Sequence, residues 1–309
     1  LRMCDRTLRD LTDRGQSIHA AMANNPDRFV FSLKTAYRYV NGGLLSTKRH
    51  NLPRACMARP RRGKGVEHRV DRTCRVGRTW DDYLKFVEGN PGVRVVEMDT
   101  VEGARGGKAL LTLIFNPFNF MLAFLVDAKT SECVPGVFSA ILSALKERYG
   151  EDGGREVFSR LFPVILTDNG TEFSNPARIE FDADGSRLTS VSCCNAYASY
   201  EKPHAGRNHG FIRLVLPKGT AYTEPAPFDG LTQHGVSLMM SHVNSYVRRG
   251  LGNKTPYDLF TAEQGEEIAN IFGISRIAAN DVTLRPSLLG IEVKVKESVS
   301  PAETAPAGK

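Results

Sequence analysis

The chain has 309 residues, 41% of them hydrophobic, which is enough for two or three domains with a sizeable buried core and excludes global disorder. Its net charge of +7 is unevenly spread. Residues 1–90 hold 19 Lys and Arg against 9 Asp and Glu, whereas the other 219 residues hold 22 against 25. A basic front part predicts contact with a polyanion, with a merely solvated basic surface as the alternative.

Residues 1–45 are predicted to be helical. In SIHAAMANNP, apolar residues at helix-face spacing follow Ser17, a candidate N-cap. After a break, SLKTAYRYVNGG has Ser32 as its N-cap, exposed Lys34 and Arg38, and a glycine pair as its stop. Two short helices around a tight connection, the second one basic, favour a helix-turn-helix that contacts DNA through Lys34 and Arg38. A small helical hairpin with no such role is the alternative.

A strongly basic stretch follows, from KRHNLPRACM through RRGKGVEHRV to RTCRVGR. Residues 48–78 contain 11 Lys and Arg against two acids, with no hydrophobic period. We interpret residues 46–80 as a linker or arm that tracks DNA phosphates. The candidate phosphate contacts are Arg59, Arg61, Arg62 and Lys64. A solvated linker without a partner is the alternative.

From about residue 80 the pattern becomes α/β. In chain order we expect a short helix from Trp80, a strand at 93–100 ending in Asp99, and a hairpin of 108–115 with 119–127. A helix at 131–150 ending at Gly150 should follow, then a buried strand FPVIL before Asp168, and finally helices at 203–216 and 231–250. The turn at 116–119 argues against a membrane span over the apolar run 109–126. This order is that of a ribonuclease-H-like sheet.

Six cysteines are present, without a C-x-x-C pair or zinc-ligand spacing. We interpret them as reduced thiols of a cytosolic protein. No signal peptide is recognised at the start. Because the first residue is Leu1 rather than Met, we expect the natural chain to begin upstream.

Asp99 and Asp168 are the candidate metal ligands. Each follows an apolar run of strand length, and open α/β sheets place their ligands at the carboxyl ends of strands. Two close carboxylates repel each other unless one of them protonates or a cation lies between them. Carboxylate oxygens suit Mg²⁺ or Mn²⁺, which can activate a nucleophile and stabilise the leaving oxygen of a phosphodiester. A strand-end Asp taken alone is more often a turn residue.

Three segments, VEMDTVEG, LTDNGTEF and NHGFIRLVLPKGT, stand in this order in the chain. Together they resemble the DDE transposases of the retroviral integrase superfamily, and more narrowly the insertion-sequence thirty family. The likeness runs from SLKTAYRYV to TPYDLF at 255–260. It implies a helix-turn-helix that reads terminal inverted repeats, and an integrase core that cuts and joins double-stranded DNA with two divalent metals. Asp99 and Asp168 match the first two acids of the family triad.

The third acid of that family is a Glu near the start of a helix, and the matching position here is Gly206. Three residues could substitute for it, namely Glu201, Glu172 and His209, but none of them matches the position. The resemblance also places Lys218, in LPKGT, near DNA, whereas a solvated turn lysine is the alternative. Arg248 and Arg249 are expected to end the 231–250 helix, where their charge complements the helix dipole, with a phosphate contact as the alternative. The same two interpretations apply to Arg213.

The predicted organisation is a helix-turn-helix region (1–45), a basic arm (46–80), an integrase core (81–262) and a C-terminal extension with a flexible tail (263–309). We predict a transposase impaired by Gly206 that acts as at least a dimer in the prokaryotic cytosol or nucleoid, without membrane contact. A catalytically inactive DNA-binding derivative is the main alternative. A ribonuclease-H-type nuclease directed at RNA shares the acidic core, but the basic helices and DNGTEF argue against it.

Overall fold

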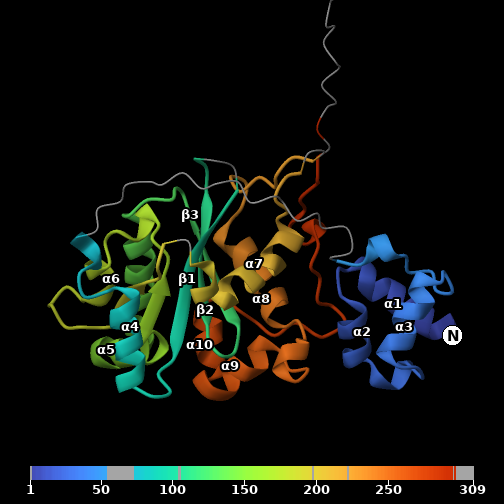
Figure 1. Ribbon diagram of the computed structural model, residues 1–309, viewed down its shortest axis with the longest axis horizontal. Coiled ribbons are helices and arrows are strands. Elements are labelled where there is room, and N and C mark those ends of the chain that lie inside the picture. Colours follow the sequence, from blue (N-terminus) through green and yellow to red (C-terminus); the bar gives the residue numbers. More distant parts are fainter. Residues whose placement is uncertain are drawn as a thin grey trace, which may run out of the picture.

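The computed structural model describes residues 2–53, 73–103, 106–196, 198–220, 223–294 and 296. It is a mixed α/β structure in which a five-stranded sheet is flanked by helices (Figure 1), in agreement with the expected fold class. The strands are β1 (Val95–Glu102), β2 (Ala109–Phe115), β3 (Phe120–Val126), β4 (Val164–Thr167) and β5 (Ser190–Cys193). The helices are α1 (Arg2–Asp13), α2 (Ile18–Asn24), α3 (Leu33–Asn41), α4 (Trp80–Gly89), α5 (Cys133–Leu161), α6 (Ala177–Glu180), α7 (Pro203–Val215), α8 (Gln233–Asn244), α9 (Pro256–Gln264) and α10 (Glu266–Ile271).

The sheet has the order β3-β2-β1-β4-β5. Its first three strands form an antiparallel meander, and β4 and β5 are parallel to β1. The predicted hairpin is confirmed, since β2 and β3 pair over their whole length around the turn at 116–119. β2 is buried at every position, as expected for a central strand covered on both faces.

The expected end of the first strand is wrong. β1 does not end at Asp99 but continues to Glu102, because its antiparallel ladder with β2 extends to the pair Glu102–Ala109. The parallel ladder with β4 stops earlier, at the pair Glu97–Leu166. Asp99 therefore lies on the part of β1 that extends past its parallel neighbour.

Helices cover both faces of the sheet. In Figure 1, α5 and α6 lie on one side of it, and α7 and α8 on the other. The expected stop at Gly150 is confirmed by its positive φ of 79°, which interrupts α5. A second helical piece that the sequence did not predict follows it to Leu161.

The first three helices pack around a small core of their own. Its buried residues are Leu8, Leu11, Ile18, Ala21, Ala36, Val40 and Leu45. The predicted N-caps are confirmed, because the hydroxyl of Ser17 accepts the backbone N–H of Ala20 and that of Ser32 accepts the N–H of Thr35. The sequence did not predict α1 as a separate helix.

The helical unit contacts the chain beyond α10. The amide of Gln16, fully buried, donates to the backbone oxygens of Ala279 (2.9 Å) and Val282 (3.0 Å). Gly15 has a φ of 84°, and a Cβ there would lie 2.4 Å from the backbone oxygen of Leu284. Only glycine permits this close approach of two backbones.

Two predictions fall outside the described residues: most of the basic arm, at 54–72, and the end of the flexible tail, at 297–309. Within the described ranges, none of the helices has the length and apolar character needed to cross a membrane.

Candidate functional site

Asp99 and Asp168 meet because of the strand register. The last parallel pair is Glu97 with Leu166, so the same register continued by two residues sets Asp99 opposite Asp168. Asp168 directly follows the end of β4. The sequence prediction that these two carboxylates lie together therefore agrees with the structure.

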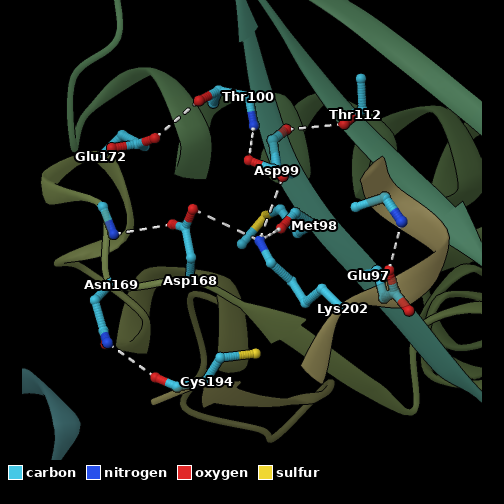
Figure 2. A network of polar contacts seen from close by, with 12 residues as sticks. Glu97, Met98, Asp99, Thr100, Thr112, Asp168, Asn169, Glu172, Cys194 and Lys202 are labelled. Carbon is cyan, nitrogen blue, oxygen red and sulfur yellow. Dashed lines mark hydrogen bonds and ion pairs between the residues drawn. The ribbon is translucent and has the colours of Figure 1, made fainter. Parts of the chain in front are cut away.

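Lys202 lies between the two carboxylates, as Figure 2 shows. Its ammonium nitrogen is 3.6 Å from Oδ2 of Asp99 and 3.7 Å from Oδ2 of Asp168, and it donates to the backbone oxygen of Met98 at 3.0 Å. Its side chain is only 7% exposed. A buried ammonium needs partners of this kind, since an unpaired buried charge is strongly unfavourable.

The other carboxylate oxygens are held by the backbone. Oδ1 of Asp99 accepts the N–H of Thr100 at 2.8 Å, and Oδ1 of Asp168 accepts the N–H of Gly170 at 2.9 Å. Each aspartate is thus fixed on one side and faces Lys202 with its remaining oxygen.

Glu97 fixes the start of α7. It lies two residues before Asp99 and so on the same face of β1. Its buried carboxylate accepts the backbone N–H groups of His204 (3.4 Å) and Ala205 (2.7 Å), which have no partner within the helix. A carboxylate at a helix N-terminus also complements the helix dipole. Lys202 precedes this first turn, so Glu97 determines where the ammonium lies.

Gly206 is exposed in the first turn of α7, beside the buried face of the helix. Lys202, Gly206, His209 and Arg213 are spaced four, three and four residues apart, which puts them along one helix face. The other three contact the sheet through Lys202 with Asp99, His209 Nε2 with Thr112 Oγ1 (2.8 Å), and Arg213 with the backbone oxygen of Glu102 (2.8 Å). A Cβ on Gly206 would meet no atom within 4 Å. A glutamate there has room, and its spacing places it on the same side of α7 as His209 and Arg213.

The three residues considered as substitutes for the third acid have other partners. Glu201 precedes α7, as predicted, and accepts both the backbone N–H and the side-chain amide of Asn195. Glu172, which is 2% exposed, accepts the hydroxyl of Thr100 (2.9 Å) and pairs with Lys129 (3.2 Å). His209 bonds Thr112, and burial lowers the pKa of its imidazole, with Asp99 opposing that shift.

The residues present do not complete a divalent-metal site. The two aspartates are of the right donor type, because hard cations prefer carboxylate oxygens. Across the described part of the chain, however, no cluster of three or more His, Cys, Asp or Glu side chains is placed to hold a metal ion. Lys202 lies between the two donors that exist. The two-metal site with Mg²⁺ or Mn²⁺ therefore stays a prediction.

The thiols beside the site are protonated. Burial raises the pKa of Cys193 to about 11 and that of Cys194 to about 12. Both are free, as are Cys4, Cys74 and Cys133, which agrees with the reduced thiols expected from the sequence. Thiols with such pKa values are poor nucleophiles at neutral pH, so they supply no alternative chemistry.

The predicted DNA contacts are scattered. Lys34 and Arg38 are exposed on α3, and Lys218 is exposed three residues after α7 ends. The candidates in the arm, Arg59, Arg61, Arg62 and Lys64, lie outside the described residues.

The expected role of Arg248 and Arg249 at a helix end is wrong, because α8 ends at Asn244. The guanidinium of Arg248 instead lies 4.3 Å from the ring centre of Phe211 and donates to Asn208 and to the backbone oxygen of Val243. Arg213 is also used internally, since it donates to the backbone of Glu102 and Leu216.

Sequence reasoning missed Lys202 and Glu97 as parts of this site. A signal for Glu97 was present: a glutamate in an otherwise apolar strand, two residues before Asp99, shares its face. For Lys202 the signal was weaker, since a lysine just before a helix is ordinary on a protein surface. Its burial depends on β1 and β4, which are distant in sequence.

The chain is similar in sequence to a curated protein. The chain is 26% identical over 251 residues to a probable transposase for the insertion-like sequence element IS1161 of Streptococcus salivarius. The match covers 80% of this chain and 64% of that protein, so the chain spans less than two thirds of its relative's length. No family model matches the chain.

Proposed function

We propose that this chain is a DNA transposase of the DDE type, close to the insertion-sequence thirty family, whose metal-dependent strand cleavage and strand transfer are impaired by Gly206. It binds the terminal inverted repeats of an insertion sequence and acts as at least a dimer in the prokaryotic cytosol. The similarity to a probable transposase supports the general class.

One observation carries the proposal. Two aspartates from neighbouring parallel strands turn one oxygen each to a single cation, Lys202, and the helix that follows this lysine has an open position in its first turn. Paired strand-end carboxylates of this kind suit the binding of divalent metals that act on phosphodiesters. The open position is Gly206, where the resembled family has its third acid.

The size of the impairment can be bounded. A bound metal contributes several kcal/mol of transition-state stabilisation. If one missing ligand misplaces a metal at a loss of about 4 kcal/mol, the rate falls roughly a thousandfold. Glycine near a helix start costs only about 1 kcal/mol relative to a good helix former. The fold therefore tolerates Gly206 far better than the chemistry does.

DNA binding is assigned to the basic front part. Lys34 and Arg38 are exposed on α3, the second helix of the proposed helix-turn-helix, and the arm with Arg59, Arg61, Arg62 and Lys64 adds positive charge. Lys218 is exposed three residues beyond α7, in the loop that is basic in the resembled family, and we retain it as a DNA contact.

The decisive experiment is strand transfer with Mn²⁺ on a labelled duplex that carries the inverted repeat of the encoding element. The chain is compared with Gly206→Glu, and with Gly206→Gln as a matched control of the same size without the charge. We expect only Gly206→Glu to cut and join, with a gain of about a thousandfold that follows from one restored ligand.

Other outcomes are equally informative. Robust cutting by the unaltered chain would contradict the impairment and direct attention to Glu201 or His209. If neither protein cuts but both bind the repeat specifically, the chain is a catalytically inactive DNA-binding derivative. The incomplete donor set is the observation that favours this second function.

A further inference from the structure

The ammonium of Lys202 occupies the point at which two carboxylates converge. Its nitrogen lies at nearly equal distances from the facing oxygens, 3.6 Å from Asp99 and 3.7 Å from Asp168. Figure 2 shows the side chain reaching into the centre of the network from the start of α7. This is the position in which a cation offsets the repulsion between the two aspartates.

This placement of Lys202 is built into the fold. The ammonium is anchored on the backbone oxygen of Met98, one residue before Asp99. The helix start that carries Lys202 is fixed by the carboxylate of Glu97, which accepts two of its free N–H groups. Lys202 is 7% exposed, its ammonium is hydrogen-bonded, and its backbone directly precedes a fixed helix start. It is therefore not a surface lysine in chance contact with an acid.

We propose that Lys202 is the resident cation of the aspartate pair, and that a divalent metal can bind there only by displacing it. The inference rests on the proposed function, in which Asp99 and Asp168 are what remains of a metal site. An ammonium and a divalent metal are both positively charged and repel each other at short range. They therefore exclude one another from the space between the same two carboxylates. The chain as written therefore binds divalent cations weakly.

Gly206 strengthens this exclusion. Lys202 directly precedes α7 and Gly206 lies in the first turn of that helix, so we expect a carboxylate at 206 to offer the Lys202 ammonium a second partner. Glycine offers no such alternative partner, and Lys202 stays with the aspartates. The same substitution thus removes a metal donor and leaves the competing cation in place.

The test measures Mn²⁺ binding to the full chain without DNA, by the loss of the EPR signal of free Mn²⁺ during titration. We expect Lys202→Met, which keeps the length of the side chain and removes its charge, to bind Mn²⁺ at least tenfold more tightly than the unaltered chain. Tenfold corresponds to about 1.4 kcal/mol. Lys202→Arg keeps the charge and should not bind more tightly than the unaltered chain.

Lys129→Met is the matched control. Lys129 also pairs with two carboxylates, the buried one of Glu172 and the exposed one of Glu102, but not with the aspartate pair. Its removal lowers the net charge by the same amount and should leave Mn²⁺ affinity within twofold. An equal gain in both variants would mean that general electrostatics, rather than displacement, controls binding, and would overturn the proposal.

The proposal is also overturned if Lys202→Met binds Mn²⁺ no more tightly than the unaltered chain, or if neither binds it. Should Lys202→Met fail to fold, Lys202→Gln replaces it, because its amide can still donate to the oxygen of Met98 and the same tenfold gain is expected. The proposed function is judged separately. Loss of specific binding to the inverted repeat by the unaltered chain would contradict that function and leave the Mn²⁺ result standing.

Discussion

His242 accepts a buried hydrogen bond from the backbone, which requires its imidazole to be neutral. The residue lies near the end of α8, is 7% exposed, and accepts the backbone N–H of Thr283 at Nδ1 (3.0 Å). Burial lowers the pKa of its imidazole; Asp281 opposes the shift and Arg14 adds to it. Since the folded state holds the proton less tightly than the unfolded state, protonation favours unfolding. The contribution of His242 to stability is complete above its unfolded pKa of about 6.5 and is lost as the pH falls below it.

We therefore expect the free energy of unfolding to decrease between pH 7.5 and pH 5.5, and to decrease less in His242→Asn, whose side-chain oxygen can accept the same N–H. Urea unfolding at several pH values measures this. His234→Asn is the control, because His234 is exposed. An unchanged pH dependence in His242→Asn would contradict the assignment. Part of the dependence should remain in that variant, because burial also lowers the pKa of His204 and His209.

The contrast between Asp168 and Lys202 marks how far the sequence could predict the site. Asp168 follows an apolar run of strand length, so a local pattern locates it at a strand end. Lys202 becomes a site residue only because the register of β1 with β4 sets two carboxylates around it. Such an assignment depends on tertiary contacts of Lys202 with Asp168 and with the more distant Asp99 and Met98, which no local pattern reports.

α8 protects the free edge of the sheet. β3 is an edge strand, and the side chains of Asn244 and Gln233 replace the missing strand. Asn244 accepts the N–H of Met121 (2.9 Å) and donates to its backbone oxygen (2.8 Å), whereas Gln233 does the same with Leu125 and Ala123. Because the unpaired N–H and C=O groups of an edge strand can pair with a strand of another chain, these side chains protect β3 against aggregation.

Asn244→Leu should destabilise the chain by about 1–3 kcal/mol, because it leaves a buried N–H and a buried C=O of Met121 without partners. Gln233→Leu should have a smaller effect, since the N–H of Leu125 lies at a more exposed place that water can reach. Urea midpoints and hydrogen exchange at the Met121 amide measure both. Equal losses in the two variants would show that edge covering is not what Asn244 contributes.

The length of α8 shows why element boundaries were harder to predict than element types. A helix was expected to extend to residue 250, since Tyr246 and Val247 continue the apolar pattern. Both side chains are indeed buried in the core, but the backbone leaves the helix after Asn244. The apolar residues report which positions are buried, and a segment that is not helical can bury them equally well.

The helical unit and the chain beyond α10 are joined by polar contacts between residues 234 to 273 positions apart. Asn25 and Asn280 exchange side-chain hydrogen bonds, and Arg285 donates to the backbone oxygens of Thr12 and Asn51. The sequence predicted helices in residues 1–45 from local capping and periodicity, and these were found. It could not predict their partner, because single polar residues at such separation leave no pattern.

The uneven charge of the whole chain leads to the last prediction. Counterion release makes DNA affinity fall with salt at a slope of about −0.9 per phosphate contacted. If the basic front part contacts about six phosphates, binding to a random-sequence duplex should weaken roughly a thousandfold between about 50 and 200 mM salt. Fluorescence anisotropy over that range measures the slope.

The same titration locates the contacts. The double variant Lys34→Ala, Arg38→Ala removes two exposed charges from α3 and should reduce the slope by about 2. Lys85→Ala, which removes an exposed charge from α4, should leave it unchanged. A flat salt dependence in the unaltered chain would contradict DNA binding by the front part. A normal slope unaffected by the α3 variant would move the contacts to the arm, because it carries most of the remaining positive charge of residues 1–90.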